Sequence, residues 1–232
     1  MTFNVSDLVN HEIRLKQVLN HFGRLDILVN NAGRAQGGHF EQTNSDIDHE
    51  LFETNVFGLI KLTRLVVNYW LNQDPIKTNE SRHVVFTSSM VAKVGGPFGA
   101  TYAATKFALH GYIESARTEL WNRRIRFTTV CPGPVVSEIR QRTLTTIGGK
   151  LEHLNLYSAF FTEMDTKRCA KLMLIAIANQ LSECWIANQP VLMSNYAAQY
   201  FPSLTMYFGP RLFSMMFNGE SILEKQTSMS VV

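Results

Sequence analysis

Short apolar runs alternate along this chain with segments of helical periodicity. The strand-like runs lie at residues 25–29, 83–87, 125–131 and 183–187. Apolar residues spaced three and four positions apart mark helical segments at 8–22, 45–71, 100–122 and 165–180. The run LDILV (25–29) is typical of a strand that is covered on both faces, as in a parallel sheet. The alternation predicts an α/β fold, a doubly wound parallel sheet of the Rossmann-like type, with irregular sequence over 132–164.

The composition is that of one well-buried domain, because the 232 residues are 45% hydrophobic and 18% charged. We expect this domain to cover residues 1–195, followed by an apolar C-terminal extension over 196–232. The net charge of +3 is spread along the chain, and the densest basic cluster, 123–126, closes a predicted helix. No nucleic-acid partner is therefore expected.

Three cysteines lie far apart, at positions 131, 169 and 184. They form no CxxC pair, and no histidine stands at zinc-ligand spacing from them. We expect buried free thiols and no metal site.

The C-terminal extension is rich in aromatic residues and methionine. Its core, YAAQYFPSLTMYFGPRLFSMMF (196–217), is broken by Pro202 and Pro210. No uninterrupted apolar run reaches the roughly 18–20 residues of a membrane-spanning helix, so a span is not expected. Two interpretations stay open: the extension covers a substrate pocket or a subunit surface, or it contacts a membrane surface.

The segment SMVAKVGGPFGATYAATK (89–106) carries groups suited to proton transfer at a carbonyl or alcohol carbon. Tyr102 and Lys106 lie four residues apart, so on a helix their side chains share one face. A neighbouring cation is expected to lower the pKa of the phenol from its usual value of about 10 and make it usable as acid and base. Ser89 follows a predicted buried strand and could face the same substrate oxygen. Alone, a Tyr and a Lys at this spacing are common, and the pair could equally be a core tyrosine beside a solvated lysine.

The order of several motifs favours the catalytic interpretation. In sequence these are Asn30-Asn31-Ala32-Gly33 after the run at 25–29, Asn55 in TNVFG (54–58), Ser89, Tyr102, Lys106, and Pro132-Gly133 after FTTVC (127–131). This order resembles the short-chain dehydrogenase/reductase superfamily over about residues 4–190. The tail, RCAKLMLIAIANQL (168–181) and WIANQPVL (185–192), is most similar to the dehydrogenase/reductase SDR family member seven group.

The resemblance implies an NAD(P)-dependent enzyme that interconverts a carbonyl and an alcohol. Tyr102 would be the proton donor and acceptor, Ser89 would hold the developing oxyanion, and Lys106 would serve both Tyr102 and the nicotinamide ribose. Asn55 would carry a water that relays protons through Lys106, although a residue at a helix kink is an equally good interpretation. A lipophilic small-molecule substrate, such as a steroid, retinoid or aromatic ketone, is expected from the apolar residues that should cover the site, Leu151, Leu154, Leu156, Phe160, Phe161 and Met164.

The resemblance also implies a set of cofactor contacts, with NADP(H) favoured and NAD(H) possible. Beside Tyr102 and Lys106, the implied cofactor-binding residues are Asn4, Asn30, Ala32, Gly33, Pro132, Gly133, Val135 and Ser137. Asn4 stands where the family commonly has an Asp that contacts adenine, and Ser137 stands where many members have Thr.

One family motif is missing from the sequence. The superfamily normally opens with a strand and a glycine-rich turn, TGxxxGIG, whose amides hold the cofactor pyrophosphate. Gly37-Gly38 and Gly95-Gly96 are poor substitutes, because neither lies between a first strand and a helix. We therefore expect a fold truncated at its N-terminus by about one βαβ unit. A cofactor-deficient isoform acting as a binding or regulatory partner, and an incomplete gene model, stay open as alternatives.

Two further expectations concern assembly and location. Helices 45–71 and 100–122 carry apolar residues on more than one face, which predicts a homo-oligomer built through them. The resemblance implies association with the endoplasmic reticulum membrane, whereas a chain complete as given would be cytoplasmic.

Overall fold

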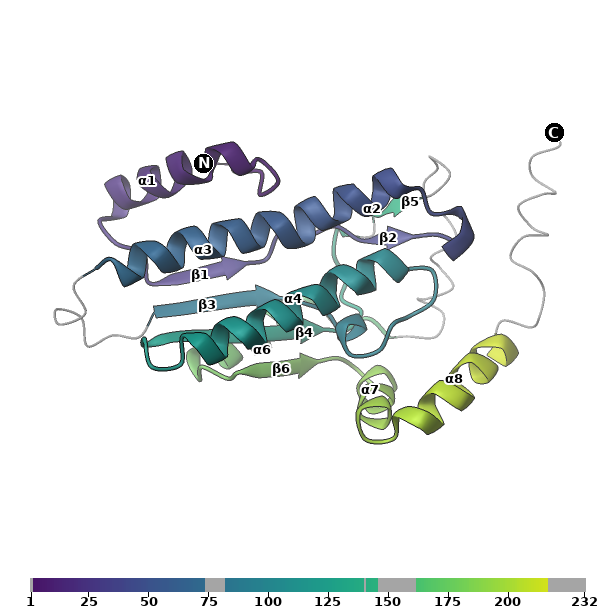
Figure 1. Cartoon of the computed structure of the whole chain (residues 1–232). Helices are drawn as coiled ribbons and strands as arrows, with labels where there is room; N and C mark the ends of the chain where they lie inside the picture. Colours follow the sequence, from purple (N-terminus) through teal and green to yellow (C-terminus); the bar gives the residue numbers. More distant parts are fainter. Residues whose placement is uncertain (1, 74–81, 140, 146–161, 217–232) are drawn as a thin grey trace. The chain divides into compact units, whose positions relative to one another are not determined.

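The predicted parallel sheet is present. The computed structural model describes residues 2–73, 82–139, 141–145 and 162–216. Its main sheet has four parallel strands in the order β1-β3-β4-β6, with the arrowheads all pointing the same way (Figure 1). These strands are β1 (Ile27–Asn30), β3 (Arg82–Thr87), β4 (Ile125–Pro132) and β6 (Glu183–Ile186). Two short strands, β2 (Gln36–Gly37) and β5 (Leu144–Thr145), pair separately and in parallel.

The helices up to residue 178 fall where the apolar periodicity predicts them, and two more lie in the C-terminal apolar segment, for which no helix was predicted. They are α1 (His11–Phe22), α2 (Ser45–Phe52), α3 (Gly58–Leu71), α4 (Ala100–Glu119), α6 (Thr166–Ala178), α7 (Val191–Tyr200) and α8 (Pro202–Met216). Short 3-10 turns lie at Leu8–Asn10, Phe40–Gln42 and Met90–Ala92. The predicted helix over 45–71 is divided by a π-helical segment, Glu53–Phe57, and this segment contains Asn55. The irregular sequence expected over 132–164 contains β5 and a parallel bridge between Val135 and Met164.

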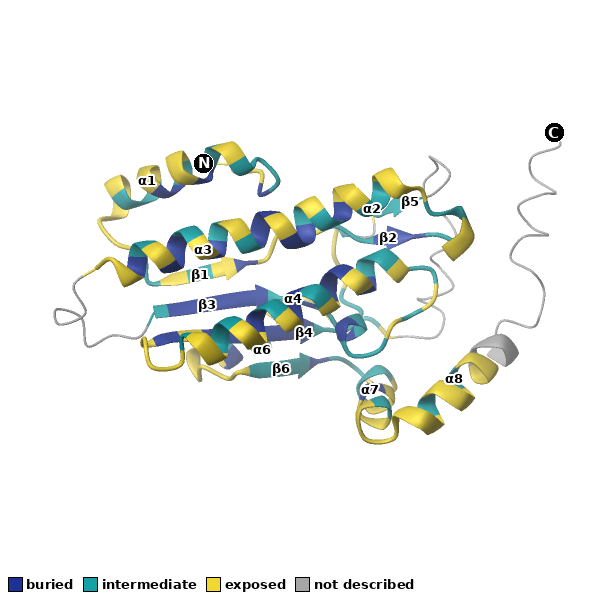
Figure 2. Cartoon of the chain, in the orientation of Figure 1, coloured by how far each residue is buried: buried dark blue, intermediate teal, exposed yellow. Residues whose placement is uncertain are grey.

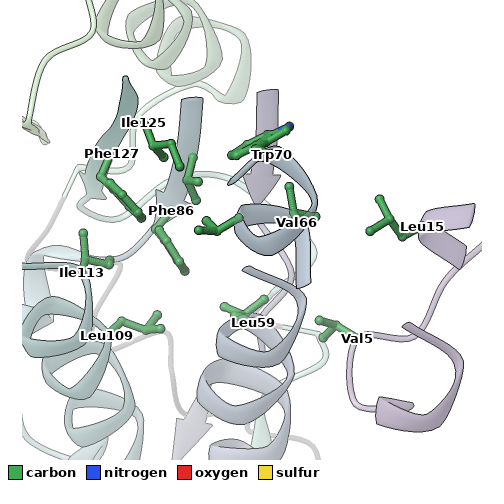
Figure 3. Close-up of a cluster of buried hydrophobic side chains, with 12 residues drawn as sticks. Val5, Leu15, Leu59, Val66, Trp70, Phe86, Leu109, Ile113, Ile125 and Phe127 are labelled. Carbon is green, nitrogen blue, oxygen red and sulfur yellow. The ribbon is translucent and has the colours of Figure 1, made fainter. Parts of the chain in front are cut away.

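Helices cover both faces of the sheet, as the doubly wound prediction requires. On one face, α3 and α4 pack on the strands through Leu59, Val66, Leu109 and Ile113, and these side chains meet Phe86 (Figure 3). On the other face, α6 packs on β4 and β6 around the buried Val85, Val130, Cys169 and Ile186. β3 and β4 lie in the middle and are buried on both sides (Figure 2). This explains why their sequences are nearly continuous apolar runs.

β1 forms one edge of this sheet and is less well covered. Val29 pairs with Val85 across the β1–β3 ladder, yet Val29 is 49% exposed and Val85 is 0% exposed. Ile27, which points to the same side as Val29, is 48% exposed. The face of the sheet that α6 covers is therefore open at β1 in the described structure.

The N-terminal segment is anchored against the start of α3. His11 Nε2 lies 2.9 Å from the carbonyl oxygen of Val5, and both residues are buried. A Cβ atom on Gly58 would overlap that oxygen and would lie 2.9 Å from the carbonyl carbon of Val5. Only glycine leaves room for this backbone contact, which joins the N-terminal segment to the helix carrying Asn55.

The chain divides into two compact units, residues 1–192 and 193–232. The second unit contains most of α7 and, within the described ranges, all of α8. None of the described helices is both long enough and apolar enough to cross a bilayer.

Candidate active site

The carboxyl ends of β1, β3 and β4 carry most of the predicted site residues. Because the strands are parallel, the segments that follow them meet at the same edge of the sheet, the usual ligand position in such folds. Gly33 follows β1, Ser89 follows β3 and Gly133 follows β4. The first turn of α4 brings Tyr102 to this edge.

Ser89 lies where β3 gives way to a 3-10 turn. Its backbone is extended, and its hydroxyl caps the turn by accepting a hydrogen bond from the amide of Val91 at 3.3 Å. The same hydroxyl lies 3.5 Å from the carbonyl oxygen of Pro132 at the end of β4. Its side chain also forms a hydrogen bond with Tyr102. The hydroxyl and the phenol predicted to act together are therefore in contact.

Tyr102 and Lys106 lie on one face of α4, as their spacing predicts. The Nζ atom of Lys106 is 5.7 Å from the centroid of the Tyr102 ring. The expected direction of the Tyr102 pKa, however, is wrong for this structure. Burial raises the pKa of Tyr102, and the hydrogen bond with Ser89 opposes that rise only in part. Enclosing the phenol in protein disfavours the phenolate more than its neighbours favour it, so Tyr102 keeps its proton at neutral pH.

Lys106 is a buried cation, with 4% of its surface exposed. Its Nζ atom donates a hydrogen bond to the carbonyl oxygen of Thr87 at 3.1 Å. Burial lowers the pKa of Lys106 from 10.5 to about 8. The side chain is therefore mostly protonated at pH 7, and it loses its charge about two and a half pH units below an exposed lysine.

Asn55 ties the loop after β1 to α4. Its Oδ1 accepts from the amide of Arg34 at 2.8 Å, and its Nδ2 donates to the carbonyl oxygen of Arg34 at 2.9 Å and to Thr105 Oγ1 at 3.1 Å. Both polar atoms of the Asn55 side chain are therefore hydrogen-bonded, and they hold the Arg34 backbone and Thr105 beside the π segment. The proton-relay role of Asn55 remains a prediction.

Gly33 lies close to both the Asn55 side chain and the Lys106 ammonium. A Cβ atom on Gly33 would lie 3.3 Å from Asn55 Oδ1 and 3.5 Å from Lys106 Nζ. The position itself is exposed. Bare glycine backbone beside a buried ammonium leaves an accessible place for a hydroxyl-bearing ligand, and Ala32, also exposed, continues this surface.

Gly133 requires glycine for a different reason. A Cβ atom there would lie 2.6 Å from the Cβ atom of Ala187, and the Gly133 amide donates to the carbonyl oxygen of Ile186 at 2.8 Å. Close packing on the segment after β6 therefore sets the path of the loop. Val135 follows in the bridge to Met164, and Ser137 is exposed.

Two predicted cofactor residues point away from this cluster. Asn30 is 2% exposed and donates through Nδ2 to Thr63 Oγ1 of α3 at 2.9 Å, and its buried Oδ1 has no partner among the described residues. Asn4 is exposed, and its Oδ1 accepts from the amide of Ser6 at 3.1 Å and from the Ser6 hydroxyl at 2.9 Å. These contacts join β1 to α3 and close the N-terminal turn.

Of the apolar residues expected to cover the site, Met164 is described, and the structure corrects its assignment. It is 3% exposed and packs in the core cluster around Val85 and Val130. The other five lie outside the described residues.

Three residues of the site were not predicted: Thr87, Arg34 and Thr105. Thr87 and Arg34 take part through their backbone groups, which carry no residue-type signal in a sequence. Thr105 lies between Tyr102 and Lys106, but only the folded helix shows that its hydroxyl meets Asn55.

The described residues fit the nicotinamide half of a dinucleotide. They supply a cation for ribose hydroxyls, a phenol, a serine hydroxyl and an open glycine backbone at one edge of the sheet. No glycine-rich turn between a strand and a helix lies within the described ranges, so no residue is assigned to the pyrophosphate.

A family model described as short chain dehydrogenase matches residues 1–147. The chain belongs to this short-chain dehydrogenase family. The mouse protein named dehydrogenase/reductase SDR family member 7 is 34% identical over 213 residues, which cover 91% of this chain and 61% of that protein. The chain thus spans about three fifths of the length of this curated relative.

Two solved structures of dehydrogenases share the fold. A Burkholderia phymatum short-chain dehydrogenase/reductase in complex with NAD has a TM-score of 0.73 and 22% identity, over 88% of this chain and 76% of that one. An alcohol dehydrogenase from Thermococcus sibiricus, complexed with 5-hydroxy-NADP, has a TM-score of 0.63 and 21% identity, over 81% and 73%.

Proposed function

We propose that this short-chain dehydrogenase interconverts a carbonyl and an alcohol on a lipophilic small molecule. The observation that carries the proposal is the contact between Ser89 and Tyr102, with the Lys106 ammonium 5.7 Å from the tyrosine ring. A hydroxyl, a protonated phenol and a buried cation together can hold a substrate oxygen and exchange a proton with it.

In the reductive direction the chain's residues act on the carbonyl oxygen. Ser89 donates a hydrogen bond to the oxygen as negative charge develops, and Tyr102 transfers its phenolic proton to the same atom. A bound nicotinamide supplies the hydride to the carbonyl carbon, so one hydride and one proton make the alcohol. Lys106 stabilises the phenolate that remains, and oxidation of the alcohol reverses each proton movement. The raised pKa of Tyr102 supports this role, because the donor must be protonated before the reaction.

The cofactor proposed is NADP(H), with NAD(H) as the alternative. The two solved structures reported above are complexes with 5-hydroxy-NADP and with NAD, and the preference for NADP(H) rests on the family resemblance. The substrate class proposed is a steroid, retinoid or aromatic ketone, which rests on the apolar residues in the segments that the sequence leads us to expect over the site.

The proton-donor assignment is tested by replacing Tyr102 with Phe. The ring still packs, but the transferable proton is gone, so we expect ketone reduction to fall by at least about 10²-fold while nucleotide binding stays nearly unchanged. Tyr112→Phe is the matched control, because Tyr112 lies on the same helix and its ring packs under Arg64. NADPH fluorescence titration and ketone turnover are measured together. Retained turnover in Tyr102→Phe, at the level of the control, would refute the assignment.

We also propose a homo-oligomer. The helical path over 45–71 and helix α4 expose large apolar side chains at Phe57, Leu71 and Phe107. Such side chains on two neighbouring helices suit an interface between copies. Light scattering at micromolar concentration tests this, and a monodisperse monomer that Phe107→Glu leaves unchanged would contradict it.

The C-terminal unit is proposed to contact a membrane surface, by resemblance that of the endoplasmic reticulum. Its large exposed apolar side chains are Met193, Tyr196, Tyr200, Phe201, Leu204, Met206, Tyr207, Phe208 and Leu212. Between residues 193 and 216 the one charged residue is Arg211, so no carboxylate repels an anionic lipid surface. Aromatic side chains and a single cation suit the boundary between lipid headgroups and acyl chains.

A further inference from the structure

A second group of polar side chains lies behind Ser89. Ser88 is 4% exposed and His110 is 7% exposed, and Ser88 Oγ lies 3.0 Å from His110 Nε2. His110 Nδ1 lies 3.6 Å from a carboxylate oxygen of Glu183, and Lys93 Nζ lies 2.9 Å from the same carboxylate group. The chain Ser88–His110–Glu183 therefore joins the end of β3, the middle of α4 and the start of β6.

The protonation states follow from the surroundings of the imidazole. Burial, followed by the charges of Lys93, Arg117 and Lys106, lowers the pKa of His110 to about 4 against the opposing charge of Glu183. Burial raises the pKa of Glu183, but hydrogen bonds from Lys93 and Trp185 outweigh it and leave that pKa below its usual value. At neutral pH the imidazole is neutral and the carboxylate is charged.

These protonation states determine which ring nitrogen of His110 carries the hydrogen. An ionised carboxylate only accepts, so Nδ1 carries the proton and faces Glu183. Nε2 is then the acceptor for the Ser88 hydroxyl. The Cys131 thiol also lies near Nε2, at 3.6 Å, and remains protonated because burial raises its pKa to about 12.

Two other functions for this group do not agree with the structure. Ser, His and a carboxylate in this order resemble a hydrolytic triad, but Ser88 is buried and its hydroxyl is not open to a substrate. His110, Glu114 and Glu183 have potential metal-ligand atoms within 4.8 Å of one another. The Lys93 ammonium, paired with Glu183, already neutralises that carboxylate and would repel a metal cation.

The residues on either side of Ser88 both belong to the active site. The carbonyl oxygen of Thr87 accepts from Lys106 Nζ, and Ser89 contacts Tyr102. Ser88 is held between them by its amide, which donates to the carbonyl oxygen of Val130 at 2.7 Å, and by its hydroxyl on His110. A shift of this one residue moves both active-site contacts.

We propose that Ser88, His110 and Glu183 are positioning residues, which hold the backbone at 87–89 and so set the places of the Ser89 hydroxyl and the Lys106 ammonium. This inference rests on the oxidoreductase function proposed above. Ser88 and His110 touch neither substrate nor cofactor in it, and they act through their neighbours.

Ser88→Ala tests the inference, with Thr128→Val as the matched control. Thr128 and His83 form a second buried hydroxyl–imidazole pair, at 2.8 Å, near the start of β3. Both substitutions remove one buried hydroxyl and should lower the melting temperature to a similar extent. In the full chain we expect Ser88→Ala to lower kcat by roughly tenfold with KM within about twofold, since even small misplacements at a site reduce rate. Thr128→Val should leave kcat within about twofold.

Two substitutions at His110 distinguish a positioning role of the side chain from a packing role. His110→Gln keeps an acceptor for the Ser88 hydroxyl and should retain most of kcat, whereas His110→Leu should resemble Ser88→Ala. Equal kcat in Ser88→Ala and Thr128→Val, or equal loss in His110→Gln and His110→Leu, would overturn the inference.

Hydrogen exchange distinguishes a failure of this inference from a failure of the proposed function. If the unsubstituted chain turns over no ketone or alcohol, the proposed function fails. Amide exchange of residue 88 still tests the network, because every variant keeps the backbone amide that donates a hydrogen bond to the carbonyl oxygen of Val130 in the unsubstituted chain. At least about tenfold loss of protection in Ser88→Ala, absent from Thr128→Val, supports the network. Unchanged protection in Ser88→Ala overturns it.

Discussion

The ammonium of Lys106 donates a hydrogen bond to the carbonyl oxygen of Thr87 at 3.1 Å. The lysine is buried, with 4% of its surface exposed. This burial makes the lysine sensitive to pH in a range where exposed lysines stay charged. Its folded-state pKa is about 8 and its ordinary value is 10.5.

Lys106 is predicted to give the protein a stability that rises with pH between about 8 and 10.5. In this window the unfolded state binds the proton more tightly than the folded state, so raising the pH removes a penalty on folding. Lys106→Met has no such group. Relative to that variant, the unsubstituted chain should gain up to about 3 kcal/mol in free energy of unfolding across the window, and nothing below pH 8. Urea unfolding at several pH values measures the difference, and a constant difference would contradict the buried cation.

Gly58→Ala is predicted to destabilise the fold, whereas Gly111→Ala should not. A Cβ atom on Gly58 would overlap the backbone of Val5, which cannot move without disturbing the His11 contact. We expect a loss of about 1–3 kcal/mol. Gly111 lies within α4 with nothing within 4 Å of its Cβ position, so alanine there should stabilise the helix by about 0.5–1 kcal/mol. The denaturant midpoints of the two variants measure these effects, and equal shifts in both midpoints would contradict the steric explanation.

The exposed edge strand is predicted to promote association on heating. Ile27 and Val29 lie half exposed on β1, so changing both to Thr should alter the free energy of unfolding by less than about 0.5 kcal/mol each. Light scattering during a thermal ramp should fall, because unpaired apolar strands favour edge-to-edge pairing. The matched control is Val85→Thr, which places a hydroxyl in the core beside Val29 and should cost about 1–3 kcal/mol. Unchanged scattering in the double variant would show that the chains associate through a surface other than β1.

Membrane contact through α8 is predicted to depend on its apolar side chains. Phe208→Glu removes an exposed ring and adds a negative charge, so binding to vesicles of phosphatidylcholine and phosphatidylserine should fall several-fold. Ser203→Glu, also exposed on α8, adds the same charge without removing apolar surface and should cost less. Flotation measures binding, and light scattering runs in parallel. Equal flotation of all three chains, with a changed mass for Phe208→Glu, would assign α8 to a subunit interface instead.

Much of the fold could be predicted from local pattern. The runs at 83–87 and 125–131 became the central strands because apolar side chains on both faces can be satisfied only inside a sheet covered on both sides. The spacing of Tyr102 and Lys106 likewise predicted their common face, because helix geometry relates residues four apart wherever the helix lies.

Two local features were predicted only in part, or wrongly, from the sequence. The π-helical segment Glu53–Phe57 contains no proline or glycine, and the sequence indicated a break there only through the alternative interpretation of Asn55 as a residue at a helix kink. Met164 looked like an apolar covering residue and proved to be core, since apolarity does not tell which surface a side chain meets.

The sequence by itself determined the order of strands and helices and the residue types available for proton transfer, because both depend on neighbours a few positions away. The tertiary structure decided the pKa of Tyr102, which burial raises, and the Ser88–His110–Glu183 contacts, which join three distant segments. Desolvation depends on everything that packs around a group, and such packing is set by residues far apart in the chain.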